Sequence, residues 1–308
     1  MAERYQKEIT CLGSVAFLTI VSDNTQRHAD NIFLDLNSTI ERFENSFSRF
    51  KKNSELSSFN LNSGNKTKVS PEFKAILMES KKIASDTDGA FNLFILPSLQ
   101  GLGYLSSWTD KSLVSPDFSD RNTATMDDLT IGSDWALIPK DSALDLGGIG
   151  KGFLLDILSD NLDKKQIDSY WLSLGGDIIC NGLDINNEPW RISVQDASVP
   201  GLIVESIKSS ANRKQSIATS GITKRKGIHN NRQWHHIINP TTGLPAKTEL
   251  LSATVIANTG AISDVMAKSI IIKGPEFAIQ LKKIGLISGF ILQKVDKTFM
   301  IDIEKENL

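Results

Sequence analysis

The stretch LDLGGIGKGF (144–153) places four glycines and a lysine between an acidic residue and an apolar segment. We predict a strand that ends near Asp145, a glycine turn over 147–152, and an amphipathic helix from Phe153. This succession is typical of phosphate sites, because glycines allow close backbone approach and first-turn amides carry the positive end of the helix dipole. The spacing matches neither a Walker loop nor GxGxxG. A nucleotide site and a purely structural turn therefore both remain open.

The composition is that of an ordinary globular protein. The 308 residues are 40% hydrophobic and 23% charged, with a formal net charge of -2, which gives no reason to expect nucleic acid as a partner. No apolar run approaches the roughly 18 residues of a membrane span. The first residues are charged and lack the apolar segment of a signal peptide, so we expect a cytoplasmic protein. Cys11 and Cys180 lie in apolar, strand-like surroundings, which predicts buried free thiols rather than a disulfide or a zinc site.

Hydrophobic periodicity and turn residues predict one α+β domain over 1–308, with long antiparallel runs and inserted helices. Helices are expected at 27–47, 54–60, 71–89, 261–272 and 275–284, and a short apolar run at 93–96 is closed by Pro97. Strands are expected at 8–22, 136–139, 143–146, 170–180, 190–195, 202–207, 216–218, 234–238, 252–257 and 290–294. Residues 105–128, rich in Ser, Asp, Thr and Asn, are predicted to form a mobile surface insertion.

Four clusters of glycine and polar residues fall at ends of predicted strands. They are DLGGIGKG (145–152), SLGGD (173–177), IATSG (217–221) and HHIINPTTG (235–243). One such cluster is commonly just a turn. Four in one chain, each with a side chain able to bind phosphate, base or metal, favour a ligand site.

Each polar residue in or near these clusters also has a purely structural alternative. Asp177 follows two glycines and could cap a turn. Asp264 lies in the first turn of a predicted helix, where the dipole alone favours a carboxylate. His235 and His236 are adjacent, so on a strand they face opposite sides and at most one reaches a site. These alternatives remain open on the residues alone.

The order and the sequences of these clusters resemble those of the ApbE family, the FAD:protein FMN transferases, across nearly the whole chain. The matching passages are FSRFKKNSELSSFN (47–60), GAFN (89–92), DLGGIGKGFLLD (145–156), SLGGDI (173–178), PWRISVQD (189–196), IATSG (217–221), HHIINPTTGLPA (235–246) and SDVMAKSIIIKG (263–274). The chain is similar to a cytosolic branch of the family in its sequence from 220 to 240 and in the DxxxK that follows. The expected lack of a signal peptide agrees with this branch.

The resemblance implies an ApbE-type α+β fold related to T-fold modules, bound FAD and a divalent metal, normally Mg²⁺. The implied reaction moves FMN from FAD to a Thr or Ser hydroxyl of a target protein and releases AMP. Such phosphoryl transfer requires neutralised pyrophosphate charge and an attacking hydroxyl held in line.

Carried over position by position, the resemblance makes His236 the group that deprotonates or orients the incoming hydroxyl. It assigns the metal to the backbone carbonyl of Gly148, the carboxylate of Asp264 and position 268, which is Lys268 here. It places Leu12 and Phe50 beside the flavin, where the family often has Met and Tyr. The other FAD-binding residues that it implies are Ala90, Phe91, Asn92, Asp145, Lys151, Gly175, Gly176, Asp177, Thr219, Ser220 and Ile238.

Three positions depart from the family pattern. Ile222 follows TSG where the family has Asp, Asn239 replaces a common Asp, and Lys268 replaces a metal-binding Thr. Because i and i+4 share a helix face, the Lys268 ammonium can pair with Asp264 and either stand in for the metal or weaken its binding. Two alternatives therefore accompany the transferase: a protein that binds FAD without transferring it, and a pyrophosphatase that cleaves FAD to FMN and AMP.

Overall fold

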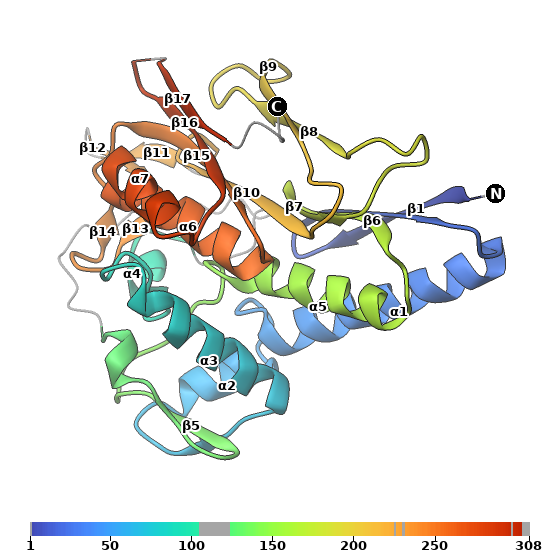
Figure 1. Cartoon of the computed structure of the whole chain (residues 1–308). Helices are drawn as coiled ribbons and strands as arrows, with labels where there is room; N and C mark the ends of the chain where they lie inside the picture. Colours follow the sequence, from blue (N-terminus) through green and yellow to red (C-terminus); the bar gives the residue numbers. More distant parts are fainter. Residues whose placement is uncertain (1, 105–123, 225, 230–231, 297, 304–308) are drawn as a thin grey trace.

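One eight-stranded antiparallel sheet organises the chain, in a computed structural model that describes residues 2–104, 124–224, 226–229, 232–296 and 298–303 (Figure 1). The strand order is β1-β2-β6-β7-β10-β15-β16-β17. These strands are β1 (Glu3–Cys11), β2 (Ser14–Ser22), β6 (Ser169–Leu174), β7 (Asp177–Asn181), β10 (Gln215–Gly221), β15 (Leu250–Ala257), β16 (Gly289–Lys294) and β17 (Phe299–Asp302). The predicted α+β class with largely antiparallel strands is confirmed.

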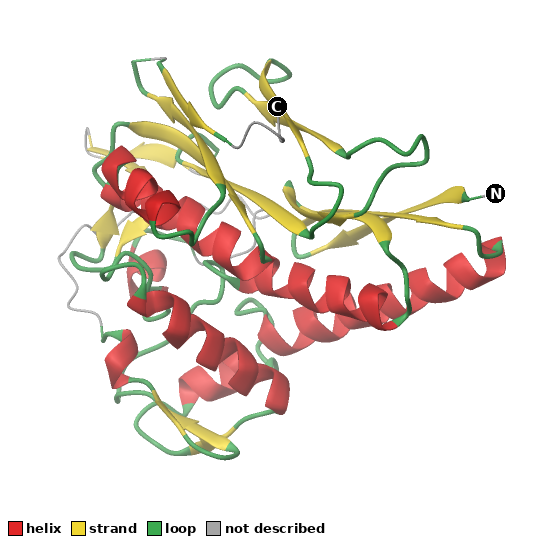
Figure 2. Cartoon of the chain, viewed as in Figure 1, coloured by secondary structure: helices red, strands yellow, loops and turns green. Residues whose placement is uncertain are grey.

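The helices and the short strands lie around this sheet (Figure 2). The helices are α1 (Gln26–Phe47), α2 (Glu55–Leu61), α3 (Pro71–Ser85), α4 (Leu96–Gly101), α5 (Gly150–Lys164), α6 (Gly260–Lys273) and α7 (Pro275–Lys283), with a 3-10 turn at Met126–Asp128. The short strands are β3 (Thr67–Lys68), β4 (Thr130–Ile131), β5 (Trp135–Leu137), β8 (Arg191–Gln195), β9 (Ile203–Lys208), β11 (Lys226–His229), β12 (Arg232–His235), β13 (Ile238–Asn239) and β14 (Leu244–Pro245). None of the helices in the described ranges is long and apolar enough to cross a membrane.

Local capping explains where the predicted helices begin. Thr25, Ser54, Ser70 and Thr259 each accept a hydrogen bond from a first-turn amide of the helix that follows, which satisfies one otherwise unpaired donor. Helix α5 lacks such a side-chain cap and begins at Gly150, three residues earlier than predicted. Its first turn therefore contains Gly150, Lys151 and Gly152.

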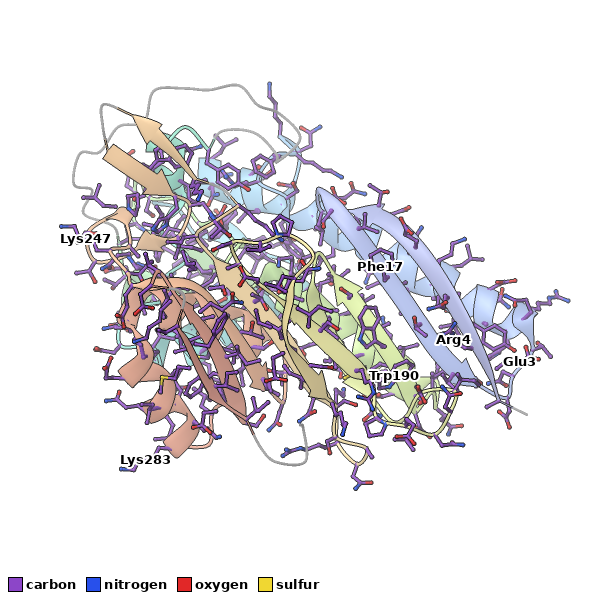
Figure 3. The ribbon with its side chains drawn as sticks, turned by 90° about the horizontal axis from the view of Figure 1, so that it is seen from above. Glu3, Arg4, Phe17, Trp190, Lys247 and Lys283 are labelled. Atoms are coloured by element: carbon purple, nitrogen blue, oxygen red, sulfur yellow. The ribbon has the colours of Figure 1, made fainter. Side chains whose placement is uncertain are left out.

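The two faces of the sheet are covered differently. Helices α1, α5 and α6 pack on one face, where the main core buries alternate residues of β2 such as Leu18 and Ile20. The β8–β9 hairpin lies over the opposite face, where Trp190 and Ile207 pack against Ile217 (Figure 3). Both cysteines are free and buried, as predicted.

Three local predictions were wrong. Residues 143–146 form no strand, because the side-chain amide of Asn60 makes both hydrogen bonds to the Leu144 backbone that a neighbouring strand would make. The predicted strand 234–238 is broken into β12 and β13. Pro97 lies inside α4, in the first turn, where its missing N–H costs nothing. Most of the predicted insertion, residues 105–123, lies outside the described residues.

Candidate active site

The site forms where the N-termini of α5 and α6 meet. Gly152 and Gly260 are in backbone contact, so that a Cβ atom added to Gly152 would lie 2.0 Å from the Gly260 carbonyl oxygen. A Cβ atom added to Gly260 would lie 2.2 Å from the carbonyl oxygen of Gly152. Only glycine at both positions permits this approach.

Two carboxylates link the helices reciprocally. Asp156 of α5 accepts hydrogen bonds from the backbone N–H groups of Gly260 (2.6 Å) and Ala261 (2.9 Å). Asp264 of α6 accepts one from the N–H of Gly152 (3.2 Å). Each aspartate lies one helical turn after the contact glycine of its own helix, so the same device operates in both directions. Burial nevertheless raises the pKa of Asp156 to about 6, although both amides act to lower it.

Two ion pairs form a charge cluster beside this crossing, made of Lys151, Asp177, Asp264 and Lys268. Lys151 pairs with Asp177, and Lys268 pairs with Asp264. Both carboxylates are buried, and Asp177 also accepts a hydrogen bond from the N–H of Thr219 (3.2 Å). Burial raises the pKa of Asp177; the two ammonium groups lower it, and the nearby Asp264 carboxylate raises it. The structure thus brings together members of three predicted clusters and the predicted metal helix.

Two turns that connect neighbouring strands of the sheet lie near the charge cluster. Gly175 and Gly176, between β6 and β7, have φ angles of 61° and 98°, which strain any residue other than glycine. A Cβ atom on Gly175 would lie 4.0 Å from Cδ of Lys151 and 2.9 Å from Oγ of Ser14. Leu12, in the neighbouring β1–β2 turn, has a φ of 52° and donates its N–H to Oε2 of Glu44 (3.0 Å). Gly175 therefore lies beside Lys151, with the Leu12 turn next to it.

A second group of residues surrounds Asp145. Its carboxylate binds Nε of Arg49 (2.8 Å) between two buried side chains. The Arg49 guanidinium carbon lies 4.4 Å from the ring centroids of both Phe50 and Tyr104. Tyr104 also packs against the apolar cluster of Ile238. Arg49 and Tyr104 were not predicted as site residues; an arginine next to an aromatic residue in FSRF was the signal for the first.

Four backbone N–H groups of the glycine segment are bonded within the protein. The N–H of Gly147 donates to Oδ1 of Asp145 (2.8 Å), and those of Ile149 and Gly150 donate to the Leu146 carbonyl (3.1 and 2.7 Å). The fourth, on Gly152, donates to Asp264. The cationic group that this segment contributes to the site is therefore the side chain of Lys151.

The GAFN and TSG residues are largely part of the fold. Ala90, Phe91 and Asn92 are buried, and Phe91 lies so close to Gly148 that a Cβ atom there would be 3.1 Å from its ring. The amide nitrogen of Asn92 donates to the Ala124 carbonyl (2.7 Å), and its oxygen accepts from the N–H of Phe94 (3.0 Å).

On β10 and just after it, the side chains are likewise engaged or buried. The hydroxyl of Thr219 bonds that of Thr254 (2.9 Å), and Ser220 is buried. Ile222 packs against the main core where the family pattern has a carboxylate.

The two adjacent histidines lie at the end of β12. Nε2 of His235 bonds the carbonyl of Ala246 (2.9 Å), and burial lowers the pKa of His235. His236 follows the strand and precedes the buried Ile238 by two residues. Because His235 is anchored within the protein, His236 remains the candidate proton acceptor of the pair.

The structure defines the class of the protein as an antiparallel α+β fold in which two buried aspartates, each paired with a lysine, lie where two helices begin close together. The profile of the ApbE family matches residues 12–286, and the chain belongs to this family. The FAD:protein FMN transferase of Haemophilus influenzae is 25% identical over 92% of this chain and 82% of its own length. The Vibrio cholerae protein of the same name is 27% identical over 86% and 80%.

Solved structures show the same fold. The ApbE protein of Thermotoga maritima superposes with a TM-score of 0.86 at 20% sequence identity, covering 97% of both chains. The flavin transferase ApbE of Vibrio cholerae superposes with a TM-score of 0.82 at 23% identity, covering 99% of this chain and 98% of its own. The predicted ApbE-type fold is therefore confirmed.

Proposed function

We propose that the protein transfers FMN from FAD to a Thr or Ser hydroxyl of an acceptor protein. The acceptor oxygen attacks the phosphorus on the FMN side of the pyrophosphate, and AMP leaves with the bridging oxygen. The observation that carries the proposal is the charge cluster at the α5–α6 crossing, in a family whose curated relatives are named FAD:protein FMN transferases.

The proposed roles follow from the chemistry of each group. The Lys151 and Lys268 ammonium groups, held by buried aspartates, would stabilise negative charge on the pyrophosphate without reorganising. Phe50 and Tyr104 offer aromatic surface for the flavin, and Arg49 is held beside them by Asp145. His236 would take the proton of the attacking hydroxyl, since imidazole titrates near neutral pH.

The residues present do not fit the divalent metal that the resemblance implies. An ammonium has no lone pair to donate, and Lys268 occupies the place of a ligand while its charge repels a cation. Within the described ranges, no three His, Cys, Asp or Glu side chains gather to hold a metal ion. We therefore derive no step through a metal, and Mg²⁺ stays a prediction of the resemblance.

The direct test is mass spectrometry of candidate acceptor domains after incubation with the protein and FAD, with and without Mg²⁺. We expect the mass of the acceptor to rise by one FMN moiety, and one AMP to be released for each adduct formed. His236→Ala should keep FAD binding and lose labelling. His28→Ala, which changes an exposed histidine on α1, is the matched control and should label normally.

The same assay separates the alternatives. FAD binding without any adduct, across a panel of acceptors, would favour a protein that only binds FAD. FMN and AMP formed without an acceptor would favour the pyrophosphatase. The cytoplasmic location and the single domain over 1–308 stay predictions.

A further inference from the structure

Both oxygens of the Asp264 carboxylate already have partners. Oδ2 accepts the N–H of Gly152 (3.2 Å), which ties α6 to the first turn of α5. Oδ1 binds the Lys268 ammonium, one helical turn further along α6. A metal ion at this carboxylate would share its oxygens with these two donors and would lie close to the Lys268 ammonium on Oδ1.

Lys268 is held in place by two acceptors. Its ammonium also donates to the backbone carbonyl of Asp264 (3.3 Å), and only 20% of its side chain is exposed. The i, i+4 spacing positions the ammonium beside the carboxylate without any contribution from a ligand. The cation is therefore part of the folded site before FAD binds.

The charge cluster is electrically balanced. Two lysines face two aspartates, and the charges are coupled, since Lys268 as well as Lys151 lowers the pKa of Asp177. A divalent ion added beside Lys268 would be repelled by the adjacent ammonium and would add two positive charges to a cluster that is already neutral. With threonine at position 268, the same site would have one positive charge fewer, and it would gain a hydroxyl group that can bind a metal ion.

We infer that the Lys268 ammonium replaces the divalent cation in this chain, so that FAD binds without added metal. This inference rests on the proposed function for the identity of the ligand as FAD. Its chemical content is that a primary ammonium fixed on α6 takes the electrostatic role toward the pyrophosphate.

The test measures FAD affinity by quenching of flavin fluorescence, in EDTA and in excess Mg²⁺. For the wild type we expect the two dissociation constants to agree within about twofold. For Lys268→Thr we expect affinity in EDTA to fall by about tenfold or more, the equivalent of losing one charged contact, and Mg²⁺ to restore it. Lys273→Thr is the matched control on the same helix, because Lys273 pairs with Asp88, whose side chain is 90% exposed, and it should change neither value.

A second measurement needs no variant. Mn²⁺ titrated into wild-type protein with FAD should give the same free-ion electron paramagnetic resonance signal as Mn²⁺ with FAD alone. A stoichiometric loss of that signal, or wild-type FAD binding that collapses in EDTA and returns with Mg²⁺, would overturn the inference.

Failure of this inference differs from failure of the proposed function. Metal-independent FAD binding with no acceptor labelling would leave the lysine assignment standing and remove the transferase. Labelling that requires Mg²⁺ would do the reverse.

Discussion

Replacing Gly152 by alanine tests the close crossing of α5 and α6. The added Cβ would lie 2.0 Å from the Gly260 carbonyl oxygen, whereas ordinary contact begins at 3.4 Å. The helices must therefore separate by about 1.4 Å, the difference between these two distances. The obstacle is backbone, which cannot rotate away as a side chain could.

The expected cost combines three effects. Overpacking of this kind costs about 1–3 kcal/mol. Separation also stretches the amide hydrogen bonds to Asp264 and Asp156, and bonds to charged groups are worth about 1.5–3 kcal/mol each. Alanine recovers about 1 kcal/mol of helix propensity relative to glycine. We expect Gly152→Ala to lower the free energy of unfolding by about 2–4 kcal/mol, allowing for partial stretching.

Urea unfolding followed by tryptophan fluorescence measures this change, since the chain has five tryptophans. Gly150→Ala is the matched control two residues away, because its Cβ would lie 3.9 Å from both Leu146 and Phe43. It should be as stable as the wild type or up to about 1 kcal/mol more stable. Unfolding of Gly152→Ala at the wild-type urea concentration, or an equal loss of stability in Gly150→Ala, would refute the proposed clash at the helix crossing.

Three further predictions concern other residues. The pKa of Asp156 in the folded protein, about 6, lies above its usual value of 3.8. The stability that the protonated carboxyl contributes is therefore present at low pH and lost as the pH rises. Relative to Asp156→Asn, the free energy of unfolding of the wild type should fall by up to about 3 kcal/mol between pH 4 and 6.5. Equal pH dependence in urea unfolding would contradict this. Arg49→Ala leaves the buried Asp145 carboxylate unpaired and should cost about 3–5 kcal/mol in the same assay. Arg42→Ala, with a 56% exposed ion-pairing side chain, should cost at most about 1 kcal/mol, and similar losses for both variants would count against the argument. The exposed Gln166 after α5 has a φ of 58°, so Gln166→Gly should raise the thermal midpoint and stabilise by about 1 kcal/mol; an unchanged or lower midpoint would show that no strain is relieved.

The features that the sequence predicted correctly depend on near neighbours in the chain. Helix α1 was expected at 27–47 and spans Gln26–Phe47, because apolar periodicity and the Thr25 cap lie within the segment itself. The pairing of Lys268 with Asp264 follows from their i, i+4 spacing for the same reason.

The features that it missed depend on partners far along the chain. The Leu144 backbone is bound by a side chain 84 residues earlier, which no strand pattern encodes. The amide of Gly152 is bound by Asp264, 112 residues later, so no residue near Gly152 in the chain indicates that this amide has a partner. Arg49 was not predicted as a site residue because its partner Asp145 belongs to another motif, 96 residues later.

The Gly152–Asp264 bond explains why lysine is a consistent replacement at position 268. Asp264 serves the fold through Oδ2 and the site through Oδ1, so whatever neutralises Oδ1 must leave Oδ2 to the α5 amide. A metal ion can approach both oxygens of a carboxylate and compete with the amide. An ammonium fixed one helical turn away binds Oδ1 and leaves the amide bond in place. The helix crossing and the site charge are thus compatible without any bound ion, and FAD would meet a site already assembled by folding.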